Sequence, residues 1–592
     1  MNETETILLK QENREKGAGR GTGAAEGLAV GQAEVKRARE TLSRYQAAKS
    51  RLETRIRENE QWFRMRHWAA QREDEKKRSS AWLLNSILNK HADFMDATPE
   101  CTVLPREESD VKAAEQLTAV LPVIFERCDW PSVYSDAAFR KLKTGTAVYA
   151  VLWDNEAADG LGDVTVRQAD LLRLFWEPGV RDIQKSRNLF YLESVDNDLL
   201  TEAYPFLEGK LTGNAAQTGA YLYDPSIRTE DKSTVADWYY KKRVGGKTVV
   251  HYCKFVNDIV LYASENDPAL RERGWYDHGK YPFVFDPLFR EEDTPVGFGL
   301  IDIMKDTQEE IDILSNEIVK NARLGSRRRY FTRNEGAINE EEFADFTKDF
   351  VHVSGSSLGE DSIREIEARP LSPVYLAVLQ NKITELKETS GSRDFTQGGT
   401  VGGVTSGVAI TALQEAANKV SRDMIAATYR AFAGVCQLTV ELVRQFYTVP
   451  RNMRILGRNG EWEFYAYDNG ALQPEARREL GVDFGQRTPL FDMSIHAHKQ
   501  NGFSRAAQNQ DAVNFYNMGF FDPAKSVQSL ACLELVDIDN KEKLMHLIEE
   551  NGRRYGNLQI PAATGEEPYG DPALQRMLSL RQETGRRMAT DG

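Results

Sequence analysis

The chain has 592 residues, of which 41% are hydrophobic and 28% are charged, and its formal net charge is −14. This composition excludes a chain that is disordered throughout, and no uncharged apolar run reaches the ~18 residues that a membrane-spanning helix needs. A protein that grips nucleic acid usually carries a basic surface, so the acidic balance excludes tight overall binding to phosphates.

The five cysteines lie far apart in the sequence, at Cys101, Cys128, Cys253, Cys436 and Cys532. No CxxC pair occurs, so neither a zinc ribbon nor thioredoxin-like chemistry is predicted. We expect these cysteines to be small buried side chains in a reducing compartment. The N-terminal residues lack a basic region followed by an apolar one, so we expect no signal peptide and a soluble, intracellular protein.

The N-terminal region predicts two helices after a disordered segment. Residues 17–31 are mostly small, and we expect residues 1–31 to be disordered. From Gln32 to about Glu75 the pattern is helical and highly charged, which is typical of a helix that is solvated or packs along one narrow stripe. A second helix, running to Pro99, places Leu83, Ile87 and His91 on one face.

Residues 145–290 predict a β-rich region. The segment TAVYAVLWD is rich in β-branched and aromatic residues, and DVTVRQ is its expected partner strand. The pattern from Val235 to Phe255 predicts a hairpin that turns at Gly245-Gly246, followed by a strand at 258–263.

An amphipathic helix is then predicted from about Ile301 to Arg323. Met304, Ile311 and Ile318 recur every seven residues, and Leu314 falls on the same stripe. The acidic residues of this helix are expected on its other faces: Asp306, Glu309, Glu310, Asp312 and Glu317.

A basic cluster follows this helix in an otherwise acidic chain: Arg327, Arg328, Arg329 and Arg333. One interpretation is a helix C-terminus, which favours cations, beside solvated surface. The other is contact with phosphates or with an acidic partner surface. A small acidic unit comes next, and Pro370 and Pro373 indicate the start of another helix, Val374 to about Thr389.

The glycine-rich stretch FTQGGTVGGVTSGVA, residues 395–409, carries no charge, and its glycines allow sharp and variable backbone paths. It precedes the longest helical pattern, which continues to Pro450 with apolar residues at three- and four-residue spacing. These residues are Leu413, Ala417, Val420, Met424, Ala427, Ala431, Val435, Leu438 and Leu442.

The C-terminal region predicts a hairpin turning at Asn459-Gly460 and a strand with the sequence FDMSIHAHK. A helical region is expected from Ser504 to Asn551. The polar residues from Gly552 onward are expected to be loose.

Three short motifs resemble ligand-binding loops but fail in detail. VGGKT lacks the first glycine of a P-loop, since position 241 is Lys241, so we interpret GGK as a hairpin turn. Gly297-Phe298-Gly299 has Asp302 where a dinucleotide-binding loop needs its third glycine. DIDNKE places Lys541 and Glu542 where a calcium loop needs a ligand and a glycine.

Two further patterns allow a hydrolase as an alternative. Residues 355–359 match G-x-S-x-G with Ser357 as the nucleophile, but the chain lacks the alternating β-α units that surround such a nucleophile. His496 and His498 would share one face of a strand and could assist catalysis or bind a metal. With no third ligand in view, solvated histidines on a polar surface are the favoured interpretation.

The order of these elements resembles the portal proteins of tailed bacteriophages, over about residues 32–551, as do WLLNSILNKHADFMDATPE, FWEPGVRDIQKSRNLFYLE and IDIMKDTQEEIDILSNEIVKNA. The resemblance implies an α+β, mainly helical portal fold. Its parts would be a disordered segment (1–31), N-terminal helices and a β-rich mixed α/β wing (32–296), a first stem helix (297–324), a small α/β clip (325–370), a second stem helix (371–390), a tunnel loop (391–407), a long tunnel helix (408–449), wing strands (450–500), a helical crown (501–551) and a flexible tail (552–592).

The resemblance also implies a ring, usually a dodecamer, at one capsid vertex of the virion, assembled in the host cytoplasm. Double-stranded DNA would be packaged and ejected through it without sequence specificity. The implied partners are the terminase large subunit, head–tail adaptor proteins, and major capsid and scaffolding proteins. No catalytic site, cofactor, metal or membrane is implied. An acidic channel would let DNA phosphates slide past.

The resemblance assigns roles to three sets of residues. The tunnel loop facing the DNA comprises Arg393, Phe395, Thr396, Gln397, Gly398, Gly399, Thr400, Val401, Gly402, Gly403 and Val404. Arg327, Arg328, Arg329 and Arg333 would contact DNA, adaptor or terminase at the clip. Met304, Ile311, Leu314 and Ile318 would pack between subunits. A different ring-forming tail or baseplate protein is the alternative within the same structural class.

Overall fold

The computed structural model describes residues 29–68, 78–211, 231–326, 330–332, 339, 341–342, 363–365, 371–391, 419–456, 462–479, 482–499, 513, 515–535 and 541–559. The fold is α+β with helices predominating, which confirms the predicted class. The chain forms two compact units, the first of residues 1–453 and 465–500 and the second of residues 454–464 and 501–592.

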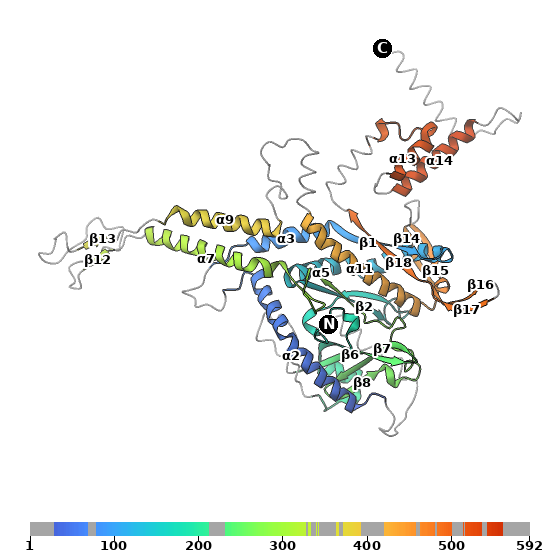
Figure 1. The fold of residues 1–592 in the computed structure, drawn as a ribbon, viewed down its shortest axis with the longest axis horizontal. Helices are drawn as coiled ribbons and strands as arrows, with labels where there is room; N and C mark the ends of the chain where they lie inside the picture. The colour runs from blue at the N-terminus through green and yellow to red at the C-terminus, as the bar shows by residue number, and fades with distance from the viewer. Residues whose placement is uncertain are drawn as a thin grey trace, which may run out of the picture. The chain divides into compact units, whose positions relative to one another are not determined.

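The larger unit contains most of the helices and sheets (Figure 1). Its helices are α2 (Gln32–Phe63), α3 (Trp82–Met95), α4 (Val111–Arg127), α5 (Trp130–Thr144), α6 (Asn197–Ala203), α7 (Leu300–Ser326), α9 (Pro373–Ser390) and α11 (Lys419–Phe446). Its strands up to α7 are β1 (Ala97–Pro105), β2 (Thr146–Asp154), β3 (Asp163–Gln168), β4 (Leu174–Trp176), β5 (Asn188–Asp196), β6 (Lys232–Val244), β7 (Lys247–Val256), β8 (Ile259–Ala263), β9 (Phe283–Pro287), β10 (Phe289–Arg290) and β11 (Gly297–Phe298).

The later strands all belong to two-stranded sheets, and the last of them pairs with β1. They are β12 (Tyr330–Thr332), β13 (Ile363–Glu365), β14 (Arg451–Leu456), β15 (Trp462–Tyr467), β16 (Glu475–Glu479), β17 (Val482–Arg487) and β18 (Phe491–Lys499). β14 pairs with β15, as the predicted hairpin requires, while its expected turn at Asn459-Gly460 lies outside the described residues.

Two antiparallel sheets form the body of the larger unit. One has the strand order β4-β5-β6-β7-β8 and the other β3-β2-β9. The predicted β2–β3 and β6–β7 hairpins are both confirmed. Gly245 and Gly246 have φ values of 56° and 83°, the left-handed pair that a tight two-residue hairpin turn needs. GGK is therefore a turn.

Helix α2 lies against these sheets along one narrow stripe, as expected. Its buried residues include Val35, Ala38, Leu42 and Ile56. The helix ends at Phe63, and not near Glu75, because Met65 turns into the left-handed region with φ 54°.

The predicted disordered segment 1–31 is ordered at its end. The Val30 backbone exchanges two hydrogen bonds of 2.9 Å with the Asn266 side chain, and Val30 is buried. This contact fixes the chain immediately before α2 begins.

The prediction that the second helix runs to Pro99 is wrong. Helix α3 ends at Met95, and Pro99 lies in strand β1, opposite Ala497 of β18. The β1–β18 ladder joins segments almost 400 residues apart, so local sequence gives little indication of it.

Helix α11 packs against β1, β18, β2 and β9. Phe432 from this helix meets Trp130 of α5 and Phe125 of α4, with ring centroids 4.8 and 5.2 Å apart. The helix ends at Phe446, before Pro450, and its described length is about 42 Å for 28 residues. The predicted start near residue 408 lies outside the described residues.

The described part of the smaller unit includes the helices α13 (Ser526–Leu535) and α14 (Lys541–Gln559). Helix α14 continues past Asn551, so a loose chain beginning at Gly552 was a wrong prediction. A side chain at Gly552 would come within 2.4 Å of Ser526 Oγ, so the glycine permits close packing.

Candidate functional site

Helices α7 and α9 form an antiparallel hairpin and lie side by side (Figure 1). Helix α9 begins as its prolines predict: Pro373 occupies the first turn, and Ser372 Oγ accepts a hydrogen bond from the Val374 amide. It ends at Gly391, which has a left-handed φ of 69°. Lys382 of α9 bridges to Glu310 of α7 at 2.8 Å.

Asp312 anchors this hairpin to the body of the protein. Its side chain is completely buried, although the sequence pattern placed it outside the apolar stripe of α7. Asp312 Oδ1 accepts hydrogen bonds from the Ser80 amide at 2.8 Å, Ser80 Oγ at 2.7 Å and Gln308 Nε2 at 2.9 Å. Its Oδ2 lies 3.1 Å from His67 Nε2.

The electrostatics of this anchor favour the ionised carboxylate. Burial by itself would raise the pKa of Asp312, but the hydrogen bonds from His67, Ser80 and Gln308 together lower it below its usual value. The anchor therefore holds a buried negative charge that accepts several hydrogen bonds, as buried charges in proteins require.

Two more polar side chains of α7 extend the anchor. Gln308 Oε1 accepts from the Leu83 amide at 2.9 Å. Asn316 exchanges hydrogen bonds of 3.0 and 2.8 Å with the Arg78 backbone. The segment leading into α3 is thus fixed along α7 by directional bonds.

Ser79, His67 and Asp312 lie together without forming a catalytic triad. Ser79 Oγ is 3.4 Å from His67 Nε2, and the same nitrogen faces Asp312. In a triad the two ring nitrogens serve the serine and the carboxylate separately. His67 also stacks on Trp62 at 3.7 Å between ring centroids, which supports a structural role.

The apolar stripe of α7 is partly used within the chain. Met304 and Ile311 are buried at 1% and 0% exposure, and α7 packs against α2, α3 and α5. Leu314 and Ile318 are half-buried. Packing of these four residues between subunits stays a prediction, and the first two have little surface left to offer.

Helix α9 exposes apolar side chains over its first turns. Val374, Tyr375, Leu376 and Val378 are 63%, 46%, 55% and 38% exposed. An apolar cluster of this kind on a soluble protein usually marks a contact surface.

Helix α3 holds both flanks of segment 392–418. On one flank, Lys387 of α9 lies over the Trp82 ring, with its Nζ 5.3 Å from the centroid. On the other, Lys90 of α3 donates to Ser421 Oγ of α11 at 2.8 Å, and Ser421 Oγ donates to Asp93 at 2.7 Å. The two ends of the segment are therefore fixed to one helix.

A buried ion pair secures α11 further along. Lys141 Nζ of α5 is 2.7 Å from Asp286 Oδ1, 2.6 Å from Thr428 Oγ1 and 3.1 Å from the Met424 carbonyl. Burial lowers the pKa of Lys141, while Asp286 opposes this effect. Three elements, α5, β9 and α11, meet at this pair.

The comparison with protein families supplies the decisive observation. A family model described as phage P22-like portal protein matches residues 92–582. The chain belongs to the P22-like phage portal protein family. The match confirms the resemblance noted from the sequence and includes α7, α9 and α11, whereas α2 precedes it. No curated protein matches the chain.

Several site residues expected of this portal protein lie outside the described residues. These are the tunnel-loop residues Arg393 and 395–404, the cluster Arg327, Arg328, Arg329 and Arg333, and Ser357. β12 begins directly after the first three arginines and pairs with β13, Tyr330 opposite Glu365.

The histidine pair can be placed in part. His496 is half exposed, with its Nε2 3.8 Å from the Glu100 carboxylate, and the side chain of His498 lies outside the described residues. Within the part of the chain that the structure describes, no group of three or more His, Cys, Asp or Glu side chains could hold a metal ion.

The cysteines are free, and Cys101, Cys253 and Cys436 are buried as predicted. Cys128 is half-buried and Cys532 is exposed, which corrects the prediction for both. Among the described helices, none combines the length and apolar composition that spanning a bilayer requires.

Proposed function

We propose that the chain assembles into a ring at one vertex of a phage capsid, through which double-stranded DNA is packaged and ejected. The observation that carries this proposal is the family match over residues 92–582. The portal family is structural, and we propose no catalytic activity for this member.

The α7–α9 hairpin is the proposed stem, and residues 325–370, which connect the two helices in the sequence, are the proposed clip. Residues 391–407 would supply the tunnel loop, and the proposed tunnel helix, residues 408–449, includes α11. The anchors on α3 support this assignment, because a loop that meets moving DNA needs both ends fixed on a rigid element. The β-rich body would be the wing, and α13 and α14 the crown.

Charge supports passage of DNA without a firm grip. The chain has a net charge of −14, and a ring multiplies that charge. Phosphates would be repelled by most of the surface, so a duplex could slide. Arg327, Arg328, Arg329 and Arg333 are the proposed exception at the clip, where they would meet DNA, the terminase large subunit or a head–tail adaptor protein. Major capsid and scaffolding proteins are proposed partners of the remaining surface.

Electron microscopy of the purified protein tests this proposal. The protein is imaged alone and after addition of purified capsid and scaffolding proteins. We expect closed rings with an axial hole wide enough for duplex DNA. Rings whose pore excludes a duplex in every class would contradict the proposal and favour a ring-forming tail or baseplate protein. Failure to form rings under both conditions would contradict it as well.

A further inference from the structure

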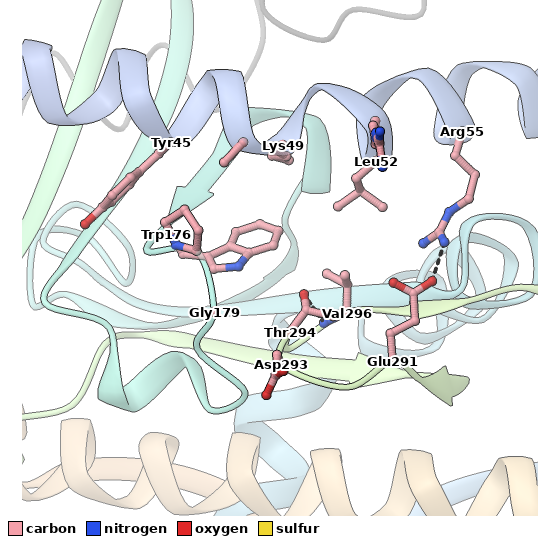
Figure 2. A pocket seen from close by; sticks show the side chains of 13 residues that line it. Tyr45, Lys49, Leu52, Arg55, Trp176, Gly179, Glu291, Asp293, Thr294 and Val296 are labelled. Carbon is pink, nitrogen blue, oxygen red and sulfur yellow. Dashed lines mark hydrogen bonds and ion pairs between the residues drawn. The ribbon is translucent and has the colours of Figure 1, made fainter.

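Two adjoining cavities lie along helix α2, on the side where it covers the sheets. Figure 2 shows the first, with Leu52 of α2 directed into it and Arg55 of α2 directed toward Glu291. Its volume is about 430 Å³, and that of the second is about 920 Å³. Tyr45 and Pro178 line both, so the two cavities form one groove, called here the α2 groove.

Three arginines of α2 border this groove in a row. Arg37 and Arg44 line the larger cavity, Arg51 lines the smaller one, and all three are exposed. Seven residues of helix rise about 10.5 Å and turn almost back to the same face, so the guanidinium groups follow one edge. Among the described residues, none of the three forms an ion pair with a carboxylate, although the chain as a whole is acidic.

Three of the acidic groups that line the groove have partners. Glu291 pairs with Arg55, Glu265 pairs with Lys242, and Glu177 accepts a hydrogen bond from the Arg187 amide. These three carboxylates are bound to groups other than Arg37, Arg44 and Arg51, so the arginine row keeps positive charge at the exposed edge of the groove.

The floor of the groove is aromatic. Trp238 and Tyr240 stack with ring centroids 4.3 Å apart in the larger cavity, and Trp176 lies in the smaller one. Lys49 sits beneath, donating to the carbonyls of Leu171 and Leu174 at 2.6 and 2.8 Å. Flat apolar rings below a row of guanidiniums suit a ligand with both apolar and anionic side chains.

We propose that the α2 groove binds an acidic peptide segment of another protein, with carboxylates on Arg37, Arg44 and Arg51 and apolar side chains on the aromatic floor. Duplex DNA fits less well, because its bases are stacked inside the duplex and would leave the aromatic floor uncovered. The groove is formed by α2 and by the β-rich body, which the proposed function assigns to the wing and not to the channel.

Fluorescence anisotropy with a labelled peptide tests the proposal on the full-length protein. The probe is a peptide in which glutamates alternate with tryptophan and leucine, and a second peptide has glycine in place of the apolar residues. We expect the first to bind more tightly than the second. The variant Arg37→Gln/Arg44→Gln/Arg51→Gln should weaken its binding about tenfold, since each exposed pair contributes modestly.

The matched control is Lys36→Gln/Arg39→Gln/Arg57→Gln, which removes the same charge from α2 at positions that do not line the groove. Its affinity should stay within about twofold of the unmodified protein. Equal weakening in both variants, equal binding of both peptides, absence of binding, or tighter binding of a short DNA duplex that displaces the peptide would each overturn the proposal. Ring formation is measured separately, so its failure leaves this test unaffected.

Discussion

Lys141 and Asp286 form an ion pair in the interior of the portal protein, with 2.7 Å between Nζ and Oδ1 and with 0% and 1% of their side chains exposed. Asp286 Oδ2 also accepts from Thr428 at 2.8 Å. The pair therefore holds α11 against the sheet that lies beneath it.

Removal of the Lys141 cation should destabilise the fold, because Asp286 would stay buried without its partner. We expect Lys141→Met to lower the free energy of unfolding by about 3–5 kcal/mol, measured by urea unfolding with tryptophan fluorescence. Arg39→Met, which breaks the exposed pair with Asp258, should cost less than about 1 kcal/mol. Similar losses in both variants would show that burial of the pair does not matter.

Asp312 predicts an acid-sensitive anchor. Its folded-state pKa lies below the ordinary value of 3.8, so its contribution to stability is complete above that pH and is lost as pH falls through the lower, folded-state pKa. The stability advantage of the unmodified protein over Asp312→Asn should therefore shrink below about pH 3.8. Stability measured against pH tests this, with Asp306→Asn on the exposed face of α7 as the control. An advantage that stays constant on acidification would contradict the prediction.

For Lys49 we predict the opposite dependence of folding stability on pH. Burial lowers its pKa from 10.5 to about 7, although Glu53 and Asp170 act to raise it. Between these values the unfolded chain binds more protons at this residue, so its contribution to folding grows as pH rises, by up to about 1.4 kcal/mol per pH unit. Stability relative to Lys49→Met should rise from pH 7 toward pH 10, with Lys36→Met as the matched control on α2. A stability difference between the two proteins that does not change with pH would refute the lowered pKa of Lys49 in the folded state.

The exposed start of α9 predicts an assembly-defective variant. Leu376 is 55% exposed, so a charge there should disturb contacts between subunits without unfolding the chain. We expect Leu376→Glu to reduce closed rings in electron micrographs while leaving the melting temperature within about 2 °C, as surface changes usually do. Thr384→Glu, also exposed on α9, should assemble normally. Normal rings from Leu376→Glu would show that this surface is not a contact between subunits.

We predict that changes within segment 392–418 impair the handling of DNA but not the assembly of the ring. Deleting Thr396 to Val404 should leave rings intact, because the anchors at Lys387 and Ser421 lie outside the deletion. Packaging or retention of DNA, measured as nuclease-protected DNA in assembled particles, should fall. Replacing the same residues by a glycine–serine segment of equal length separates loss of the sequence from loss of length. Normal packaging in the deletion would remove the proposed role of the loop.

Local patterns in the sequence predicted much of the fold. The hairpin at Gly245-Gly246 and the start of α9 at Pro373 were foreseeable because turn glycines and helix-initiating prolines act on their own backbone. Strand β1 was missed because its stability comes from β18, which is distant in sequence. Helix α2 was overextended, since a charged helical pattern does not show where the backbone turns at Met65.

By itself, the sequence determined the order of the elements, the acidic balance of the chain and the resemblance to portal proteins, because periodicity, composition and element order are properties of neighbouring residues. Only the tertiary structure decided which charged side chains are buried. Asp312, Lys49 and Lys141 have the same chemistry as surface residues, and each is stable in the interior because segments distant in sequence supply its partners. Such partners exist only after the chain has folded.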